Sequence, residues 1–182
     1  MEFRIETERL ILRPFKTEDA EAFYLMGASD DNGVKKYLEG WDFKNVSSAR
    51  DKVESYIKGE NVNFIVLVIE HNKEFVGVVA GSVSTMLRNS TMKITYAISP
   101  EHRGNGYCTE AVKAFVRNMY EVLGISTFKF HILKGNVASV GCARKVGAVY
   151  TFTYGSPDEF DIYILQMTPP PMDAMHPWAI LI

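Results

Sequence analysis

The sequence has very few cysteines: Cys108 and Cys142 are the only two in 182 residues. They lack metal-ligand spacing and are too few for a disulfide framework, so we expect a reducing, cytoplasmic setting. Apolar runs of the roughly 20 residues needed to span a bilayer are also missing. The first residues do not form an apolar signal segment. We therefore expect a cytoplasmic protein without a membrane partner.

Positive charge is not in excess, since 20 Lys and Arg stand against 22 Asp and Glu. Nucleic-acid binding needs clustered cations that neutralise phosphates, so a nucleic-acid partner is not expected. The hydrophobic content of 47% and the charged content of 23% are ordinary for a globular protein. A chain of this length can bury a sufficient core without a disulfide or a metal. No metal site is expected.

Hydrophobic periodicity predicts a series of short strands and helices. Thr17 is expected to cap the first helix, and Ser48 to open a later one through a capping box. A stripe of apolar residues from Cys108 to Leu123 marks the strongest amphipathic helix. The predicted strands are 10–15, 63–69, 75–83, 92–98, 128–132, 148–151 and 161–165, and the other predicted helices are 34–38 and 137–146.

The end of the chain differs from the rest. Pro169, Pro170 and Pro171 cannot extend a central strand or a helix, so the sheet should end near Thr168. We expect one domain over residues 1–168 and a Pro-rich tail over residues 169–182. The last residues of this tail are apolar enough to dock on the domain or on a partner.

The segment Arg103-Gly104-Asn105-Gly106-Tyr107-Cys108 joins a predicted strand to the amphipathic helix. N–H groups at a helix N-terminus lack intrahelical partners and attract anions. Glycine lets the backbone approach a ligand closely, so these N–H groups can converge on phosphate oxygens. Taken alone, the segment also fits a simple glycine-rich connection. It lacks the Gly-Lys-Ser/Thr of a nucleotide triphosphate loop.

A second motif follows at Asn136-Val137-Ala138-Ser139, with Lys145 and Gly147 after it. With this motif in the right order and spacing, the sequence resembles the GNAT superfamily of acetyltransferases. The resemblance is greatest to the RimJ/RimL-like branch and covers about residues 5–168. It matches the family's Arg/Gln-x-x-Gly-x-Gly/Ala loop at Arg103 and Gly106, with Cys108 at the final small position. The opening 6–13 also resembles that branch.

The resemblance implies an α/β (α+β) fold, with a mixed, mainly antiparallel sheet and helices on both faces. It also implies that acetyl-CoA binds in the central cleft. The pantetheine arm would pair with backbone groups of Tyr96 and Ile98, and Asn136 would join the cofactor site. The loop residues expected to hold the pyrophosphate are Arg103, Gly104, Asn105, Gly106, Tyr107 and Cys108.

For catalysis, the resemblance suggests Ser139 as the proton donor to the departing thiolate. Many relatives use a Tyr seven residues after the Asn, where this chain has Ala143. The alternative for Ser139 is a structural position in the first turn of a helix capped by Asn136. Some relatives place a Glu base where this chain has Lys93, and a lysine serves as a base only when its pKa is strongly lowered. No base is assigned.

The absence of a base favours weakly basic acceptors. An α-amine is about a tenth neutral at pH 7, whereas less than one lysine in a thousand is. We therefore expect N-acetylation of a peptide or protein α-amine, with a small amine (a polyamine, an amino acid or an amino-sugar antibiotic) as the alternative. A non-catalytic acyl-CoA-binding module is the alternative of another class, and a homodimer is compatible with the sequence. Expected acceptor-lining residues are Tyr37, Glu39 and Trp41, although Tyr37 and Trp41 also suit core packing.

Overall fold

One eight-stranded sheet organises the protein, with the strand order β1-β2-β3-β4-β5-β6-β8-β7. The computed structural model describes residues 4–28, 33–38, 40–83, 91–156 and 158–168. All neighbouring strands run antiparallel except β5 and β6, which are parallel. The strands are β1 (Ile5–Glu6), β2 (Ile11–Arg13), β3 (Phe64–His71), β4 (Glu74–Val83), β5 (Thr91–Ile98), β6 (Thr127–Leu133), β7 (Val149–Tyr154) and β8 (Phe160–Gln166).

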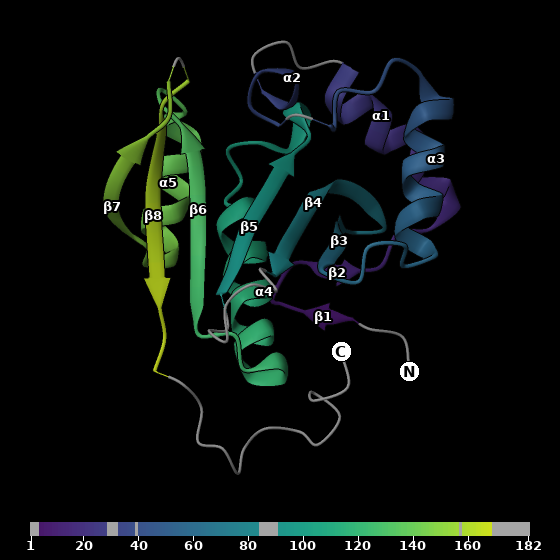
Figure 1. Ribbon diagram of the computed structural model, residues 1–182. Helices are drawn as coiled ribbons and strands as arrows, with labels where there is room; N and C mark the ends of the chain where they lie inside the picture. The colour runs from purple at the N-terminus through teal and green to yellow at the C-terminus, as the bar shows by residue number, and fades with distance from the viewer. Residues whose placement is uncertain (1–3, 29–32, 39, 84–90, 157, 169–182) are drawn as a thin grey trace.

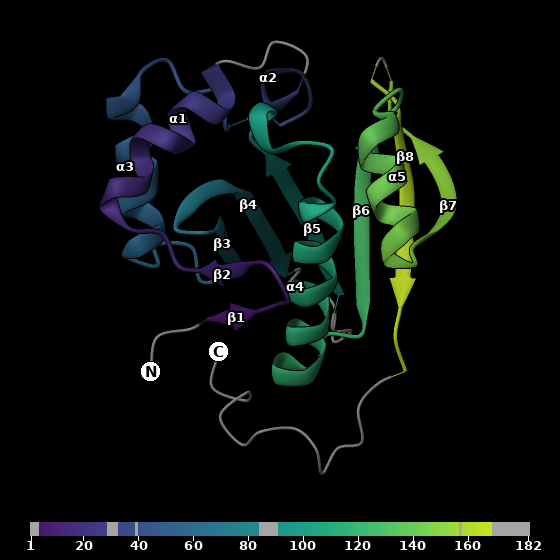
Figure 2. The ribbon, with the colours of Figure 1, turned by 180° about the vertical axis from the view of Figure 1, so that it is seen from behind.

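The α-helices cover the two faces of the sheet unequally. The long helix α4 (Tyr107–Leu123) and α5 (Val137–Val146) lie on one face, here called the back face (Figures 1 and 2). On the opposite, front face, α1 (Ala20–Ala28), α2 (Val34–Tyr37) and α3 (Val46–Ile57) gather over the β2–β4 half. This arrangement confirms the predicted mixed sheet with helices on both faces.

Strand alternation sorts the apolar side chains into two cores, because successive residues of a strand point to opposite faces. In β3, Leu67 and Ile69 belong to the back core beneath α4, whereas Val68 belongs to the front core beneath α1 and α3. In β5, Ile94 joins the back core and Ala97 the front core. The same alternation therefore assigns a face to every side chain of β5 and β6.

The parallel strands β5 and β6 pair over only four residues each. Their ladder runs from Thr91 opposite Thr127 to Ile94 opposite Phe130. Beyond that point β5 remains paired with β4 up to Ile98, and β6 remains paired with β8 up to Leu133. The two strands thus part at their carboxyl ends, where Figure 1 shows β5 leaning away from β6. Two strands that each lack a partner on one side can accept an extended ligand between them.

Two local expectations need correction, and one short strand is an addition to the prediction. The capping box of α3 is formed by Asn45 and Ser48, so the helix begins at Val46 and Ser48 lies in its first turn. Thr17 is not a cap but the first residue of a 3₁₀ turn (Thr17–Asp19), where the Asp19 carboxylate accepts from the Lys16 N–H at 2.7 Å. The short strand β1 was not predicted.

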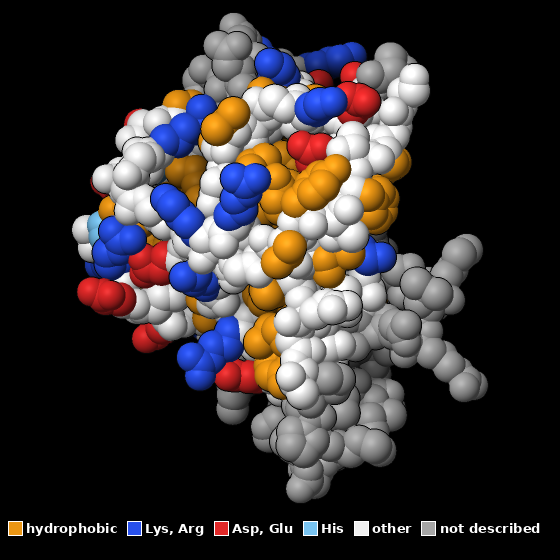
Figure 3. Space-filling view, turned by 90° about the vertical axis from the view of Figure 1, so that its left-hand side faces the viewer, with side chains coloured by type: hydrophobic (Ala, Val, Ile, Leu, Met, Phe, Trp, Pro, Cys, Tyr) orange, Lys and Arg blue, Asp and Glu red, His pale blue; other side chains and the backbone are white. Residues whose placement is uncertain are grey.

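Strand β7 forms one edge of the sheet and exposes large apolar side chains. Val149 is 69% exposed, and Tyr150, Phe152 and Tyr154 are between 46% and 49% exposed. Figure 3 shows hydrophobic side chains gathered on this side of the molecule. Within the described ranges, no helix has the length and apolar character that a membrane crossing requires. The predicted tail, residues 169–182, lies outside the described residues.

Candidate active site

The predicted phosphate loop leads directly into α4. Gly104 and Gly106 both have a φ of +80°, a left-handed conformation that a Cβ would strain. Gly106 is the N-cap of α4 and offers no side-chain cap, so the first N–H groups of the helix face outward from a bare backbone. The loop therefore has the geometry of an anion site at a helix N-terminus.

The polar side chains of this loop stabilise its shape. Arg103 donates from Nε to the Ile98 carbonyl at 3.1 Å, which ties the loop to the end of β5. The Asn105 amide donates to the carbonyls of His102 and Arg103 at 3.1 and 3.2 Å. Arg103 and Asn105, both expected in the cofactor site, thus shape the backbone that would contact a pyrophosphate.

Arg9 and Glu110 clamp the loop from outside. The Arg9 guanidinium donates to the Asn105 carbonyl at 3.0 Å, pairs with Glu110 at 2.6 Å and lies 4.9 Å above the Tyr107 ring. Glu110 also accepts from the Thr7 hydroxyl at 2.6 Å. Burial acts to raise the Glu110 pKa, but these bonds from Thr7 and Arg9 outweigh it and lower the pKa. Sequence reasoning assigned Arg9 no role, because its contacts lie about a hundred residues away.

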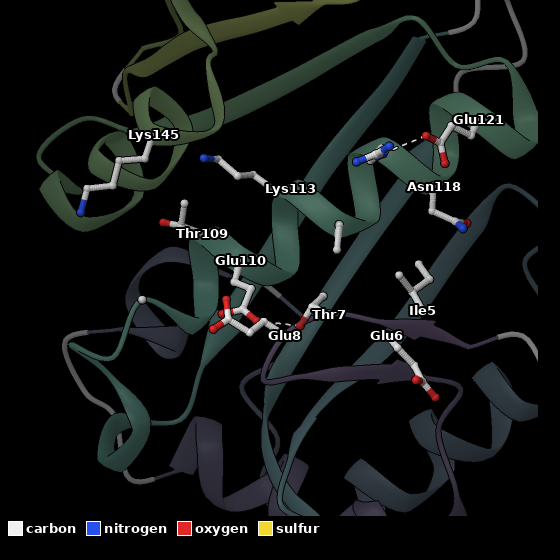
Figure 4. A pocket seen from close by; sticks show the side chains of 13 residues that line it. Ile5, Glu6, Thr7, Glu8, Thr109, Glu110, Lys113, Asn118, Glu121 and Lys145 are labelled. Carbon is white, nitrogen blue, oxygen red and sulfur yellow. Dashed lines mark hydrogen bonds and ion pairs between the residues drawn. The ribbon is translucent and has the colours of Figure 1, made fainter.

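A hollow of about 790 Å³ runs along the outer side of α4 from Gly106. Figure 4 shows Lys113 and Thr109 on one side of α4, near Lys145 of α5, and β1 residues on the other side. Lys113 and Lys145 supply positive charge beside the loop. The same hollow is also lined by four carboxylates, Glu6, Glu8, Glu110 and Glu121, of which Glu110 pairs with Arg9 and Glu121 with Arg117. Only the side toward α5, with Thr109, Lys113 and Lys145, therefore fits a ligand that carries phosphates. Lys113 has no motif around it that could have indicated this position.

Behind the parting strands, Tyr96 of β5 meets Ser139 of α5. The Tyr96 hydroxyl lies 2.8 Å from Ser139 Oγ and donates to the Ser139 carbonyl at 3.1 Å. Burial raises the pKa of Tyr96, so it remains a neutral phenol. The Asn136 side chain accepts from the Ser139 N–H at 3.1 Å and caps α5, as the structural alternative predicted. Ser139 is thus half-buried, with its hydroxyl against Tyr96 of β5.

The two cysteines meet in the same region. Cys108 Sγ lies 3.4 Å from Cys142 Sγ, with both residues in the reduced form. The hydrogen bond between the thiols and burial both raise the pKa of Cys108. The same bond lowers the pKa of Cys142 against the effect of burial. Cys108 thus joins the first turn of α4 to the middle of α5.

Two of the three predicted acceptor-lining residues, Tyr37 and Trp41, lie in described segments. Trp41 is only 5% exposed in the front core and donates from its indole N–H to the Tyr56 hydroxyl at 3.2 Å, which favours the packing alternative. Tyr37 ends α2, half-buried, beneath the Lys36 ammonium at 5.1 Å. Glu39 lies outside the described residues. Ala143, at the position of the tyrosine of many relatives, is fully buried.

Metal ligands do not gather anywhere in the parts of the chain that the structure describes, where no group of three His, Cys, Asp or Glu could hold an ion. The sheet parts between β5 and β6 beside the glycine loop at the N-terminus of α4, an arrangement that can hold an extended ligand with an anionic end. The chain matches the family model described as "Acetyltransferase (GNAT) domain" over residues 9–149. It therefore belongs to the GNAT acetyltransferases and is an acetyl-CoA-dependent N-acetyltransferase.

Three similar proteins agree with this assignment. The uncharacterized N-acetyltransferase YoaA of Bacillus subtilis (strain 168) is 26% identical over 87% of this chain and 94% of its own length. The microcin C7 self-immunity acetyltransferase MccE, solved with acetyl-CoA and AMP, is 20% identical with a TM-score of 0.78, covering 88% of this chain and 94% of its own. RimL, a ribosomal L7/L12 α-N-protein acetyltransferase solved with coenzyme A, is 16% identical with a TM-score of 0.79. The match covers 91% of this chain and 98% of the RimL chain. At these identities, the likeness to MccE and to RimL shows a shared fold.

Proposed function

We propose that this acetyltransferase transfers the acetyl group of acetyl-CoA to the α-amine of a peptide or protein. The observation that carries the proposal is the set of side chains around the gap between β5 and β6. Tyr96 and Ser139 are hydroxyls, Cys108 and Cys142 are reduced thiols, and Lys93 stands where some relatives carry a glutamate. None of these side chains is a carboxylate base.

Because no carboxylate is among these described side chains, we propose that the acceptor arrives partly neutral. An α-amine with a pKa near 7.7–8.0 meets this need, whereas a lysine near 10.4 does not. The difference in available nucleophile is on the order of 3 kcal/mol at pH 7. RimL, which shares the fold, is named as an α-N-protein acetyltransferase, and this supports the same acceptor class here.

In the proposed site, the glycine loop and Lys113 hold the phosphates of acetyl-CoA. The backbone of Tyr96 and Ile98, at the unpaired side of β5, holds its pantetheine arm. The thioester then lies near Ser139, whose hydroxyl supplies the proton that the departing thiolate needs. Tyr96 orients that hydroxyl from behind.

The test measures free-thiol release from acetyl-CoA with three sets of acceptors: peptides with free α-amines, the same peptides Nα-blocked, and small amines. We expect release with the free peptides at a kcat/KM at least about tenfold above that with any other set, a difference of 1.4 kcal/mol. Faster release with polyamines, amino acids or amino sugars would replace this acceptor with the small-amine alternative. That alternative draws support from MccE, which shares the fold and was solved with AMP.

A further inference from the structure

Three basic side chains stand together on the front face, where β5 and β6 begin to part. Lys93 and Lys129 are direct partners in the parallel ladder. Both alternate with residues of the back core, Ile94 on β5 and Phe128 and Phe130 on β6, so they point to the front. His131 follows two residues after Lys129 on the same face. These residues, Lys93, Lys129 and His131, are called the front basic cluster.

The cluster borders the approach to the proposed acetyl site. His131 is the first residue of β6 beyond the last ladder pair, Ile94 with Phe130. The back face at this point is filled by α4, α5 and the glycine loop. On the front face, the helices α1–α3 pack over β2–β4, and among the described residues Ala97 is the residue of β5 that joins this front core. An acceptor that comes to the gap from the side opposite the glycine loop therefore crosses Lys93, which is exposed, and Lys129 and His131, which are half-buried.

Two of the three residues of this cluster, Lys93 and Lys129, carry positive charge. Among the residues that the structure describes, neither Lys93 nor Lys129 forms an ion pair. Burial, and after it the positive charges of Lys93 and Lys129, lower the pKa of His131 to about 4. Its ring is held by the Tyr154 hydroxyl, 3.0 Å from Nδ1. A neutral imidazole and two free ammonium groups thus face the incoming molecule.

We propose that the front basic cluster selects acceptor peptides in which acidic residues follow the α-amine. This inference rests on the proposed function. The carboxylates of Asp or Glu in the second and third positions would bind Lys93 and Lys129, and so hold the amine over the gap. An isolated cation would be repelled by the same charges, because like charges in one site oppose each other.

The test compares three peptides that differ only in positions two and three: Ser-Asp-Asp-Gly-Phe, Ser-Asn-Asn-Gly-Phe and Ser-Arg-Arg-Gly-Phe. In the wild-type enzyme we expect kcat/KM to fall at least tenfold from the acidic to the neutral peptide, and further to the basic one. In the double variant Lys93→Glu/Lys129→Glu the order should reverse. If that double variant fails to fold, Lys93→Met/Lys129→Met, which adds no negative charge, takes its place. In this second variant the three peptides should have equal kcat/KM.

Lys52→Glu is the matched control, because Lys52 is an exposed lysine on α3. It should keep the wild-type order, and all variants should keep the wild-type affinity for acetyl-CoA. Equal rates for the three peptides in the wild type, or an unchanged order in the double variants, would overturn the inference.

Failure of the proposed function has a different result. Release with free aspartate above that with asparagine, but with none of the peptides, would overturn the peptide acceptor and support charge selection by the cluster. No preference between these two amino acids, again without peptide turnover, would overturn both.

Discussion

The hydroxyl of Tyr96 lies 2.8 Å from Ser139 Oγ, so β5 is joined to the first turn of α5 behind the point where β5 and β6 part. The Tyr96 hydroxyl has one proton to donate, and the Ser139 carbonyl at 3.1 Å competes for it. When that proton goes to Oγ, the Ser139 proton is free to point into the gap. When it goes to the carbonyl, Ser139 donates to Tyr96 instead. This contact lets Tyr96 control the direction of the Ser139 proton.

Replacing Ser139 with alanine should therefore reduce chemistry more than binding. We expect Ser139→Ala to lower kcat by about 10²-fold, the usual range for loss of a general acid, with a change of less than about threefold in KM for acetyl-CoA. Tyr96→Phe should lower kcat by a smaller factor, because Ser139 keeps its hydroxyl. Steady-state kinetics measures both. Ser55→Ala, on α3, is the control, and an unchanged kcat in Ser139→Ala would leave Ser139 with a structural role only.

Gly106 tests the phosphate loop. An aspartate there would put a negative charge at the helix N-terminus where the pyrophosphate is expected, and would strain a backbone at φ +80°. Gly106→Asp should raise the Kd for acetyl-CoA by at least about tenfold, or 1.4 kcal/mol, in calorimetry.

The matched control for that change is Gly59→Asp, since Gly59 also has a positive φ of +65° and nothing within 4 Å of an added Cβ. It should cost stability without weakening acetyl-CoA binding. Wild-type affinity in Gly106→Asp would show that phosphates bind elsewhere.

Glu110 gives a pH dependence of stability. Its folded-state pKa lies below the ordinary value of 4.5. Above that value the carboxylate is charged in both states, and its bonds to Thr7 and Arg9 stabilise the fold. This contribution is lost as the pH falls through the lower folded-state pKa. Glu110→Gln should therefore have a lower Tm than the wild type at pH 7, and the difference should shrink toward pH 3.

Thermal unfolding between pH 7 and pH 3 measures this difference, with Glu121→Gln as the control, because Glu121 pairs with Arg117 on the exposed side of the same helix. A Tm difference that stays constant with pH would show that the Glu110 charge does not stabilise the clamp.

His131 gives a second pH dependence of stability, in this case from a base that is neutral in the folded protein. Its pKa of about 4 lies below the ordinary 6.5, so between these values the unfolded chain binds a proton that the folded protein does not. This group thus favours unfolding progressively as the pH falls from 6.5 to 4. Lys93→Met and Lys129→Met should each raise the His131 pKa, but not to 6.5, because burial remains. Titration of the imidazole by NMR measures the shift, and an unaltered pKa in both variants would show that the lysine charges do not reach the ring.

Much of the fold could be predicted from the sequence because its signals are local. The apolar stripe from Cys108 to Leu123 predicted α4. Gly124 ends α4 and Gly147 ends α5, each as a left-handed cap, with φ of +67° and +104°. Local pattern failed at Thr17, where the Asp19 carboxylate takes the backbone N–H of Lys16, and at Ser48, where Asn45 is a competing cap. Asn45 forms the cap because its side chain reaches the Ser48 N–H at 2.9 Å.

The site was predictable only in part. The loop and the Asn136–Ser139 motif are contiguous in sequence, so their positions could be read directly. The clamp between Arg9 and Glu110 and the pairing of Lys93 with Lys129 join distant segments, and only the sheet register brings them together. Trp41 shows the converse: an aromatic residue in a suitable segment was expected at the acceptor site, and the fold buries it in the front core.

The most direct test of the account is the position of the acetyl group on one peptide that carries both a free α-amine and a lysine. The peptide Ser-Asp-Asp-Lys-Phe is incubated with the enzyme and acetyl-CoA, and tandem mass spectrometry locates the modification. The account predicts acetylation of the Ser α-amine, with the lysine unmodified. Acetylation of the lysine side chain, with the α-amine free, would contradict it.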